Sequence, residues 1–200
     1  DNINFASPEV NTTILRNSTT LGNPLPLANG ADTRYYWKVI SLDNVTGAGN
    51  STETRTFLIQ SLVQLTLPND NVSFGGMVPE QSDNTTDNSP LPLLIENDGN
   101  TFIDVNISAL DDGLWFNAPS PTIFYMYRVS NYSGEEGAFN WSGSQTVFTN
   151  VPIVNNTAID LLNHTNATDI ARIDLNVTVP TTEPGGNRTS SLLFTAILSE

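Results

Sequence analysis

The segment ARIDLNVTV, residues 171–179, decides the fold class of this 200-residue chain. Apolar residues occupy every second position, and Arg, Asp, Asn and Thr fill the positions between them. Because side chains alternate between the two faces of a β-strand, this pattern predicts a strand with one buried face. The polar face of the predicted strand carries Asn176, which begins an Asn-x-Thr triplet.

The segment TFIDVNIS, residues 101–108, repeats the alternation and predicts a second half-buried strand. The tight-turn signal Asn97-Asp98-Gly99-Asn100 comes just before it. Because such a turn commonly joins neighbouring antiparallel strands, we expect residues 91–96 and 102–108 to pair as a β-hairpin.

A second hairpin is predicted near the end of the sequence. The turn signal Glu-Pro-Gly-Gly at residues 183–186 lies between the strand at 171–180 and an apolar segment at 190–198. The apolar side chains of this last segment fall on both faces, with Leu193 and Ile197 opposite the larger set. A strand that is apolar on both faces is expected to be covered on both.

Short apolar segments elsewhere predict further strands, and helical periodicity is nearly absent. The expected strands are residues 63–67, 72–74, 123–129 and 146–148, together with 3–5, 12–15, 35–42 and 54–59. Residues 158–163 are the one expected helical turn. Short strands separated by Asn, Gly, Pro and Asp clusters are typical of antiparallel sandwiches. We therefore expect an all-β chain of tandem antiparallel immunoglobulin-like β-sandwich domains, an incomplete one in residues 1–60 and a complete one in 61–200.

The first of these domains resembles the later half of a fibronectin type III or immunoglobulin-like module of secreted microbial proteins. The resemblance is carried by LANGADTRYYWKVISLD, residues 27–43, and TETRTFLI, residues 52–59. It implies two paired late strands, while the early strands of such a module have no counterpart here. It also implies that Tyr35, Trp37 and Val39 face the core and that Phe57 and Ile59 cover them from the neighbouring strand.

Residues 61–200 are similar to the repeated β-sandwich domains of archaeal surface glycoproteins. The similarity rests on LLIENDGNTFIDVNISA, residues 93–109, and on IDLNVTVPTTEPGGNRTSSLLFTA, residues 173–196. It implies a structural role at a cell surface. No catalytic motif comes with either likeness.

Asparagine triplets give the strongest functional signal. Fourteen of the 25 asparagines begin an Asn-x-Ser/Thr triplet without a central proline, many more than random placement would give. They are Asn11, Asn17, Asn44, Asn50, Asn71, Asn84, Asn106, Asn131, Asn140, Asn155, Asn163, Asn166, Asn176 and Asn187. N-linked glycans are attached at such triplets on exported chains. We therefore expect an extracellular or cell-surface glycoprotein; the alternative is that these residues serve only as turn and edge-strand residues.

Composition excludes several function classes. Seven basic residues against 21 acidic ones give a net charge of -14, so nucleic acid and anionic lipid surfaces would be repelled. The absence of cysteine excludes disulfides, thiolate metal sites and thiol nucleophiles. No apolar segment reaches the roughly 18 residues needed to span a bilayer, and we expect Asp1 to be an internal or processed start.

Candidate catalytic residues are few. His164 is the only histidine and lies inside the triplet Asn163-His164-Thr165. The adjacent carboxylates Asp111-Asp112 and Glu135-Glu136 would point apart, whereas glycoside hydrolysis needs two carboxylates across one sugar bond. Motifs for a nucleophile elbow, a phosphate loop or a zinc protease do not occur. We expect no enzymatic activity, and a glycosidase accessory domain is the weakest alternative.

Oxygen-bearing side chains gather at four places in predicted loops, at residues 69–71, 83–88, 96–100 and 111–113. Carboxylate and amide oxygens are the ligands that Ca²⁺ prefers, although none of these segments has EF-hand spacing. The alternative is that Asp and Asn close turns by bonding nearby backbone. Calcium binding is therefore left open, and no metal ligand is assigned.

Three aromatic residues lie in long predicted loops: Trp115, Tyr132 and Trp141. Exposed aromatic rings in loops could stack on sugar rings. The alternative, which we favour, is that they plug the ends of the sandwich.

Together these patterns predict a structural subunit of a glycosylated extracellular filament, such as a pilus or thread, on an archaeal cell surface. A partial sandwich leaves an open apolar face, which a strand donated by another copy of the chain would complete. Head-to-tail contacts of this kind give open polymers. The alternative is a domain of a cell-surface adhesin or S-layer glycoprotein that binds glycans or proteins, including those of neighbouring cells. No cofactor is expected beyond covalent glycans.

Overall fold

The computed structural model describes residues 32–199 except 39, 43–48 and 52, and the side chains of 40–42 and 49–51 lie outside this description. The chain divides into two compact units, residues 1–61 and 62–200. All regular structure in the described residues is β, in several antiparallel sheets, which confirms the predicted all-β class. No helix in this part of the chain is long and apolar enough to cross a membrane. The strands predicted at 3–5 and 12–15 lie outside the described residues.

The described residues of the first unit form two antiparallel strand pairs. They are β1 (Thr33–Trp37) with β4 (Arg55–Ile59), and β2 (Ile40–Leu42) with β3 (Gly49–Ser51). The register of the longer pair places Tyr35 opposite Phe57, and their rings stack with centroids 5.6 Å apart. A direct pairing of the two segments that carry the first resemblance is thus present.

The expected core of this unit is only partly present. Tyr35 is buried, but Trp37 is 44% exposed, so its predicted core position is wrong. Trp37 lies opposite Arg55 in the register, and its ring centroid is 6.0 Å from the guanidinium carbon. The ring therefore covers a cross-strand cation instead of the core. Phe57 covers Tyr35 from the neighbouring strand as expected, although it is 39% exposed, and Ile59 is half-buried. Val39 lies outside the described residues.

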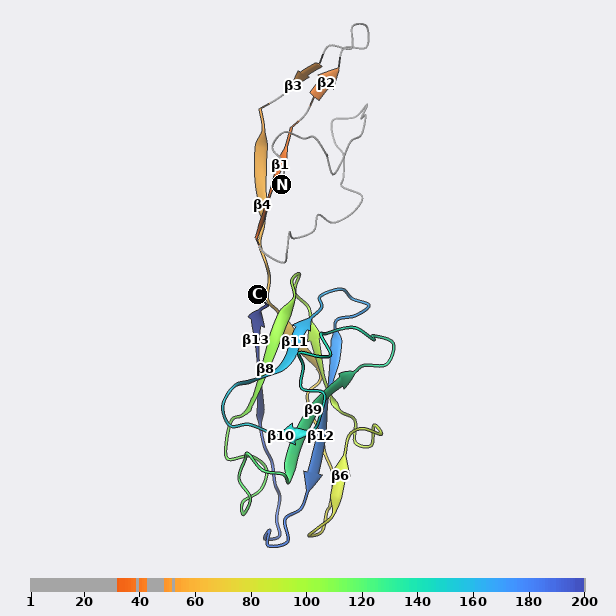
Figure 1. Ribbon diagram of the computed structural model, residues 1–200, viewed down its shortest axis with the longest axis vertical. Helices are drawn as coiled ribbons and strands as arrows, with labels where there is room; N and C mark the ends of the chain where they lie inside the picture. Colours follow the sequence, from red (N-terminus) through yellow and green to blue (C-terminus); the bar gives the residue numbers. More distant parts are fainter. Residues whose placement is uncertain (1–31, 39, 43–48, 52, 200) are drawn as a thin grey trace. The chain divides into compact units, whose positions relative to one another are not determined.

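The second unit contains two sheets. The strands of the larger sheet are β5 (Leu65–Asn69), β6 (Ser82–Asn84), β7 (Leu93–Asn97), β9 (Tyr125–Asn131), β10 (Thr149–Asn150) and β12 (Ile170–Thr178). Those of the smaller sheet are β8 (Ile103–Ala109), β11 (Asn156–Leu162) and β13 (Leu192–Leu198). The larger sheet has the order β10-β9-β12-β7-β5, with β6 also paired to β12, and the smaller has the order β11-β8-β13. In Figure 1, β13 runs along the outer side of β8.

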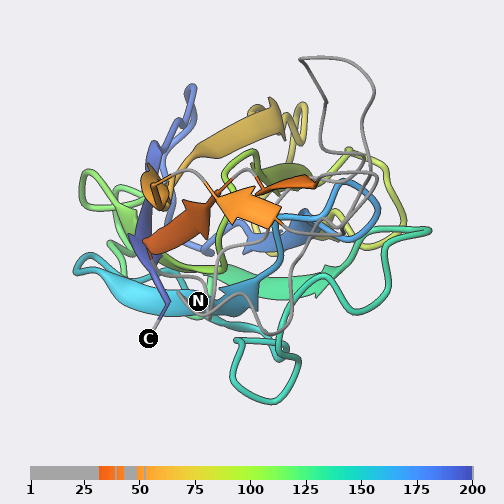
Figure 2. The same cartoon turned by 90° about the horizontal axis from the view of Figure 1, so that it is seen from above.

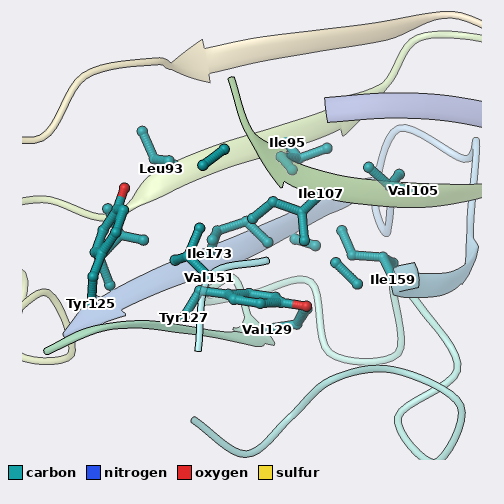
Figure 3. Packing of buried hydrophobic residues seen from close by; sticks show 14 of the residues in the cluster. Leu93, Ile95, Val105, Ile107, Tyr125, Tyr127, Val129, Val151, Ile159 and Ile173 are labelled. Carbon is teal, nitrogen blue, oxygen red and sulfur yellow. The ribbon is translucent and has the colours of Figure 1, made fainter. Parts of the chain in front are cut away.

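Alternating apolar side chains of both sheets fill one core between them, as Figure 3 shows. Ile95 of β7, Ile107 of β8 and Ile173 of β12 are fully buried there. The inward faces predicted for residues 102–108 and 171–179 are therefore correct. Burying one such side chain contributes about 1.5–3 kcal/mol, so this core is the main source of stability of the second unit.

The hairpin predicted between residues 91–96 and 102–108 is wrong, because β7 and β8 belong to different sheets. The turn between them is a corner at which Asn97 is buried. Its Nδ2 donates to the carbonyl oxygens of Thr101, at 2.9 Å, and Leu162, at 3.0 Å. The alternation identified which face each strand buries, but these two faces meet across the core instead of lying side by side.

The second predicted hairpin, between residues 171–180 and 190–198, is wrong for the same reason. β12 lies in the larger sheet and β13 in the smaller one, so the connection crosses between the layers. Arg188 holds this connection through an ion pair with Glu183 and a 2.7 Å hydrogen bond to the carbonyl oxygen of Pro184. The turn residues therefore close a loop at the end of the unit.

The helical turn predicted at residues 158–163 is wrong, because most of this segment belongs to β11. Its pairing with β8 is interrupted by register shifts on both sides of Ile159. These irregularities leave Ala158, Ile159 and Leu162 buried together. Bulges add residues to one strand, so apolar residues here recur at a helical spacing in a segment that is extended.

The other predicted strands of the second unit are present with shifted ends or are absent. The segment at 63–67 overlaps β5, 123–129 overlaps β9, and 146–148 lies just before β10. Residues 72–74 form no strand, although Val72 and Phe74 pack half-buried against the core.

The sequence also failed to predict β3 and β6, which are three-residue polar strands without apolar alternation.

Candidate functional site

The smaller sheet ends in an open edge formed by β13. Among the described residues, β8 is the only strand that pairs with β13, from Leu192 opposite Ala109 to Leu198 opposite Ile103. This register contains no shift. Residues 189–199 include no charged side chain and no proline. The backbone groups on the outer side of β13 thus form a continuous row that faces no other described strand.

The other edges of these two sheets are blocked. β5 contains Pro68 and a register shift after Thr66. β11 has two register shifts and a residue with positive φ, Leu161 at 55°. β10 has only two residues and β6, which among the described strands pairs only with β12, has three. Proline, irregular register and shortness keep edge strands from pairing with other chains. β13 has none of these features, so it is the edge best suited to accept a further strand.

The opposite side of the core is closed by residues 132–148, the connection between β9 and β10. The backbone of Gln145 bridges the two sheets: its carbonyl oxygen accepts from Val129 at 2.7 Å, and its N–H donates to Ala158 at 2.8 Å. In Figure 2 this connection, in teal, stands out from the strands as long loops. No backbone hydrogen bond between described residues joins β5 to β13 in a similar way.

β13 is apolar on both faces, as the sequence predicted. Leu192, Phe194 and Ala196 are half-buried and pack against the core. On the outer face, Leu193 is 40% exposed and Ile197 is 47% exposed. The inner face of β13 is therefore packed against the core, whereas its outer face is only partly buried.

None of the triplet asparagines described in the second unit is buried. Asn71, Asn155, Asn166 and Asn187 are exposed, and Asn84, Asn106, Asn131, Asn140, Asn163 and Asn176 are half-buried. Asn11, Asn17 and Asn44 lie outside the described residues, as does the side chain of Asn50. Accessibility is the first requirement for a glycan-bearing asparagine, and these ten side chains meet it.

Three of these asparagines lie on the outer faces of strands. Asn106 is in the central strand of the smaller sheet, between the inward-facing Val105 and Ile107. Asn84 of β6 and Asn176 of β12 lie directly opposite each other in the larger sheet. The strands thus hold these three side chains at fixed positions.

The asparagines differ in how their amide groups are used. Nδ2, the atom to which a glycan is attached, donates to Asp160 in Asn140 and to Oγ1 of Thr168, at 2.8 Å, in Asn163. Asn106 instead uses its oxygen, which accepts from the hydroxyl of Thr157 at 3.1 Å. Attachment of a sugar would compete with the first two contacts and leave the third intact.

Two of the oxygen-rich loops considered for calcium use their side-chain oxygens within their own turns. Oδ1 of Asp111 accepts from the N–H of Gly113 at 2.9 Å, and Oδ1 of Asp87 accepts from the N–H of Ser89 at 3.0 Å. In the part of the chain that the structure describes, no three Asp, Glu or His side chains could together hold a metal ion. These contacts support the turn-closing role of Asp and Asn, and calcium binding stays open.

Four carboxylates gather at one end of the larger sheet: Glu96, Asp98, Glu135 and Asp169. Burial and the neighbouring negative charges raise the pKa of both Glu96 and Asp169. Glu135 accepts from the backbone N–H groups of Asp169, at 2.9 Å, and Ile170, at 2.8 Å. Glu135 therefore holds the start of β12, which is a structural contact that its sequence pattern did not reveal.

The remaining catalytic candidates have ordinary surroundings. The ring of His164 lies edge-on to that of Phe102, with centroids 5.5 Å apart. Its backbone N–H donates to Oδ1 of Asn163 at 2.8 Å. Asp112 and Glu136 are exposed. These contacts show packing and turn formation and supply no nucleophile with a matched base.

The aromatic candidates divide between core and surface. Trp115 belongs to the core, and its Nε1 donates to the carbonyl oxygen of Phe124 at 2.9 Å. Trp141 is 51% exposed, and its ring stacks on Phe139 with centroids 5.9 Å apart. Tyr132 is half-buried. Trp115 thus fills the core as expected, whereas Trp141 presents an exposed ring.

A charged network that the sequence did not predict covers the outer face of β12. Asp174 is fully buried, with Arg172 Nη2 2.8 Å from one carboxylate oxygen and Arg128 Nε 3.2 Å from the other. The hydroxyls of Ser130, at 2.7 Å, and Thr85, at 3.3 Å, also donate to this carboxylate. The alternating pattern placed Asp174 on the outer face correctly but could not show what lies over it.

No protein-family model, curated protein or solved structure matches this chain. The open edge of β13 and the accessible asparagines are therefore the features that bear on function.

Proposed function

We propose that this chain is a structural subunit of a glycosylated extracellular filament on a microbial, archaeal cell surface. In this proposal, copies of the chain join through β-sheet contacts at the edge of β13. The observation that supports it is that β13 faces no second strand among the described residues and is uncharged and free of proline and register shifts. Natural proteins seldom leave such an edge unprotected unless another strand pairs with it.

Charge favours a contact at this edge over contacts elsewhere. Sixteen of the 21 acidic residues and three of the seven basic ones lie in residues 62–200. Arg128 and Arg172 pair with Asp174, and Arg188 pairs with Glu183. Two copies would therefore repel each other over most surfaces, whereas the uncharged β13 can approach another strand and form backbone hydrogen bonds.

For the accepting strand, we propose β4 in the first unit of the next copy. Among the described residues, β1 and β4 form a two-stranded sheet. A sheet of two strands is marginally stable in water, and a third strand with apolar side chains would stabilise it. Leu58 and Phe57 of β4 are 44% and 39% exposed. A donated strand would cover such side chains, and repeated donation would give a head-to-tail polymer.

We also propose that the accessible triplets carry N-glycans, which places the chain outside the cell. Occupancy is expected to be lowest at Asn140 and Asn163, because their Nδ2 atoms already donate hydrogen bonds within the protein. It is expected to be higher at exposed loop positions such as Asn166 and Asn187.

Electron microscopy of the purified glycosylated chain, together with sedimentation over a range of concentrations, tests the proposal. We expect filaments, or oligomers that grow with concentration. A chain that stays monomeric at every concentration would contradict polymerisation, whatever its glycans.

The second candidate function is a glycan-binding module of an adhesin or S-layer glycoprotein, which the exposed Trp141 favours. An exposed ring backed by Phe139 offers a flat apolar surface on which a sugar ring could stack. Binding to a glycan panel that is lost in Trp141→Ala, but kept in the control Phe116→Ala, would support this function. Phe116 suits the control because it is an exposed aromatic residue outside the pair.

A further inference from the structure

The outer face of the smaller sheet has an asparagine at its centre. Asn106 lies in the middle strand, opposite Thr195 of β13 on one side and Thr157 of β11 on the other. On β13, the residues two positions before and after Thr195 are Leu193 and Ile197, which lie on the same face. A glycosylation triplet thus occupies the centre of a face whose β13 side is apolar and exposed.

The amide group of Asn106 has a defined orientation. Its Oδ1 accepts from the hydroxyl of Thr157 at 3.1 Å, so the oxygen points toward β11. The nitrogen of the same amide therefore points to the opposite side, toward β13. Because N-glycans are attached to Nδ2, the first sugar leaves the protein in the direction of Leu193 and Ile197.

The distances on this face suit a sugar ring. In an antiparallel pair, diagonal neighbours on one face have Cα atoms about 7–8 Å apart, within reach of a group attached to the asparagine side chain. Thr195, directly opposite Asn106, is short enough to leave room between the two larger apolar side chains. The C–H groups of a sugar ring would remove part of Leu193 and Ile197 from water, which is favourable in proportion to the apolar area covered.

We infer that the glycan attached to Asn106 folds back over the outer face of the smaller sheet and covers Leu193 and Ile197 of β13. The inference rests on the proposed glycosylation and adds a specific structural role for one of the glycans. The occupant is the sugar nearest the protein, held there by its covalent bond. Cover on the outer face then complements the core contacts on the inner one.

Such a glycan would also direct how β13 meets another chain. A sugar above the sheet covers the side chains of the face, whereas the free backbone groups of β13 lie in the plane of the sheet. The face is then closed to non-specific apolar contacts, and the edge stays open to strand pairing. The glycan would thus restrict β13 to one mode of association.

Hydroxyl-radical footprinting of the native glycoprotein, read by mass spectrometry, tests this inference. The variants are Asn106→Gln, which removes the attachment atom, and Ser108→Ala, which removes the triplet but keeps Asn106. The control is Asn187→Gln, which removes a triplet from a loop. Samples are compared in the same assembly state, with the exposed Leu91 as an internal reference.

We expect oxidation of Leu193 and Ile197 to rise severalfold in both Asn106 triplet variants and to stay unchanged in the control. An occupied Asn106 with no such rise would overturn the inference, as would a bare Asn106 beside occupied triplets elsewhere, and both results leave the proposed function standing. Bare asparagines throughout the chain would overturn the proposed glycosylation and this inference together.

Discussion

Asn176 of β12 lies directly opposite Asn84 of β6, and each of them begins a glycosylation triplet. The neighbouring pair on this face, Ser82 and Thr178, is joined by a 2.7 Å hydrogen bond between hydroxyl groups, which fixes the register. Directly opposite side chains have Cβ atoms about 4.5–5.5 Å apart. That spacing is similar to the width of one sugar ring, so two glycans here would compete for the same space.

The first prediction is that Asn84 and Asn176 seldom carry glycans on the same molecule. Analysis of intact glycoforms and of glycopeptides should find one of the two occupied. Asn176→Gln should raise the occupancy of Asn84, whereas Asn187→Gln should leave it unchanged. Full occupancy of both asparagines in single molecules would show that the sheet surface accommodates two sugars side by side.

The second prediction concerns the buried carboxylate of Asp174. Asp174→Asn should lower the free energy of unfolding by about 3–5 kcal/mol, because Arg128 and Arg172 would lose the charge that compensates them. Asp112→Asn makes the same chemical change at an exposed position and should alter it by less than about 0.5 kcal/mol. Denaturant unfolding measures both. Similar values for the two variants would mean that the network contributes little.

The third prediction is that stability rises as the pH falls from neutral. The raised pKa values of Glu96 and Asp169, caused by burial and neighbouring charges, mean that the folded state takes up protons before the unfolded one. The resulting gain in stability begins as the pH falls to the raised pKa values of the folded state. It is complete below the ordinary pKa values of 4.5 for Glu96 and 3.8 for Asp169. Tyr125 and Tyr127 take no part, because burial raises their pKa to about 12.

Glu183 acts in the opposite direction. Burial alone would raise its pKa, but hydrogen bonds from the backbone of Asn117 and Phe116 and from Arg188 lower it below 4.5. The ionised Glu183 therefore stabilises the folded state fully above its ordinary pKa of 4.5. This contribution is lost as the pH falls through the lowered pKa of the folded state. Stability should therefore reach a maximum in mild acid and then decrease.

Thermal unfolding between neutral pH and about pH 3 measures this profile. Glu96→Gln should stabilise the protein at neutral pH and flatten the rise, whereas Glu136→Gln at an exposed site should not. A profile that falls steadily from neutral pH would contradict the role given to the four carboxylates.

The fourth prediction places a charge at the open edge. Ile197→Lys should abolish assembly and leave the fold intact, because Ile197 is 47% exposed and a lysine on an edge strand discourages further pairing. Leu161→Lys makes a matched change on β11, the other edge of the same sheet, and should not affect assembly. Sedimentation and circular dichroism separate assembly from folding. If both variants lost assembly equally, the added charge itself, and not its position on β13, would be the cause.

Much of the fold could be predicted from alternation, and the two wrong hairpins share one cause. The pattern in residues 171–179 and 102–108 identified the buried faces correctly, because burial of a strand face is a local property of its sequence. Strand pairing is not local: β7 and β8 pack across the core at the corner formed by Asn97, which the turn signal alone could not distinguish from a hairpin. In β11, the register shifts gave the segment a helical spacing.

The candidate site was predictable in part. The apolar character of residues 190–198 on both faces predicted a strand that needs cover on both sides. The sequence could not show that β13 is an edge strand, nor that Pro68, the register shifts and the shortest strands fall at the other edges. The triplets were identifiable individually, but the pairing of Asn84 with Asn176 and the amide orientation of Asn106 depend on strand register.

Hydrogen exchange at the backbone amides of β13 shows whether this strand pairs with another chain, because an edge strand leaves alternate N–H groups open to water. The native assembled material should be compared with the Ile197→Lys variant, residue by residue from Leu192 to Leu198. If β13 pairs with a strand of another copy, every amide in this segment is protected in the assembly, and alternate amides exchange quickly in the variant. Rapid exchange of alternate amides in the assembled material itself would show that β13 does not pair with a strand of another copy.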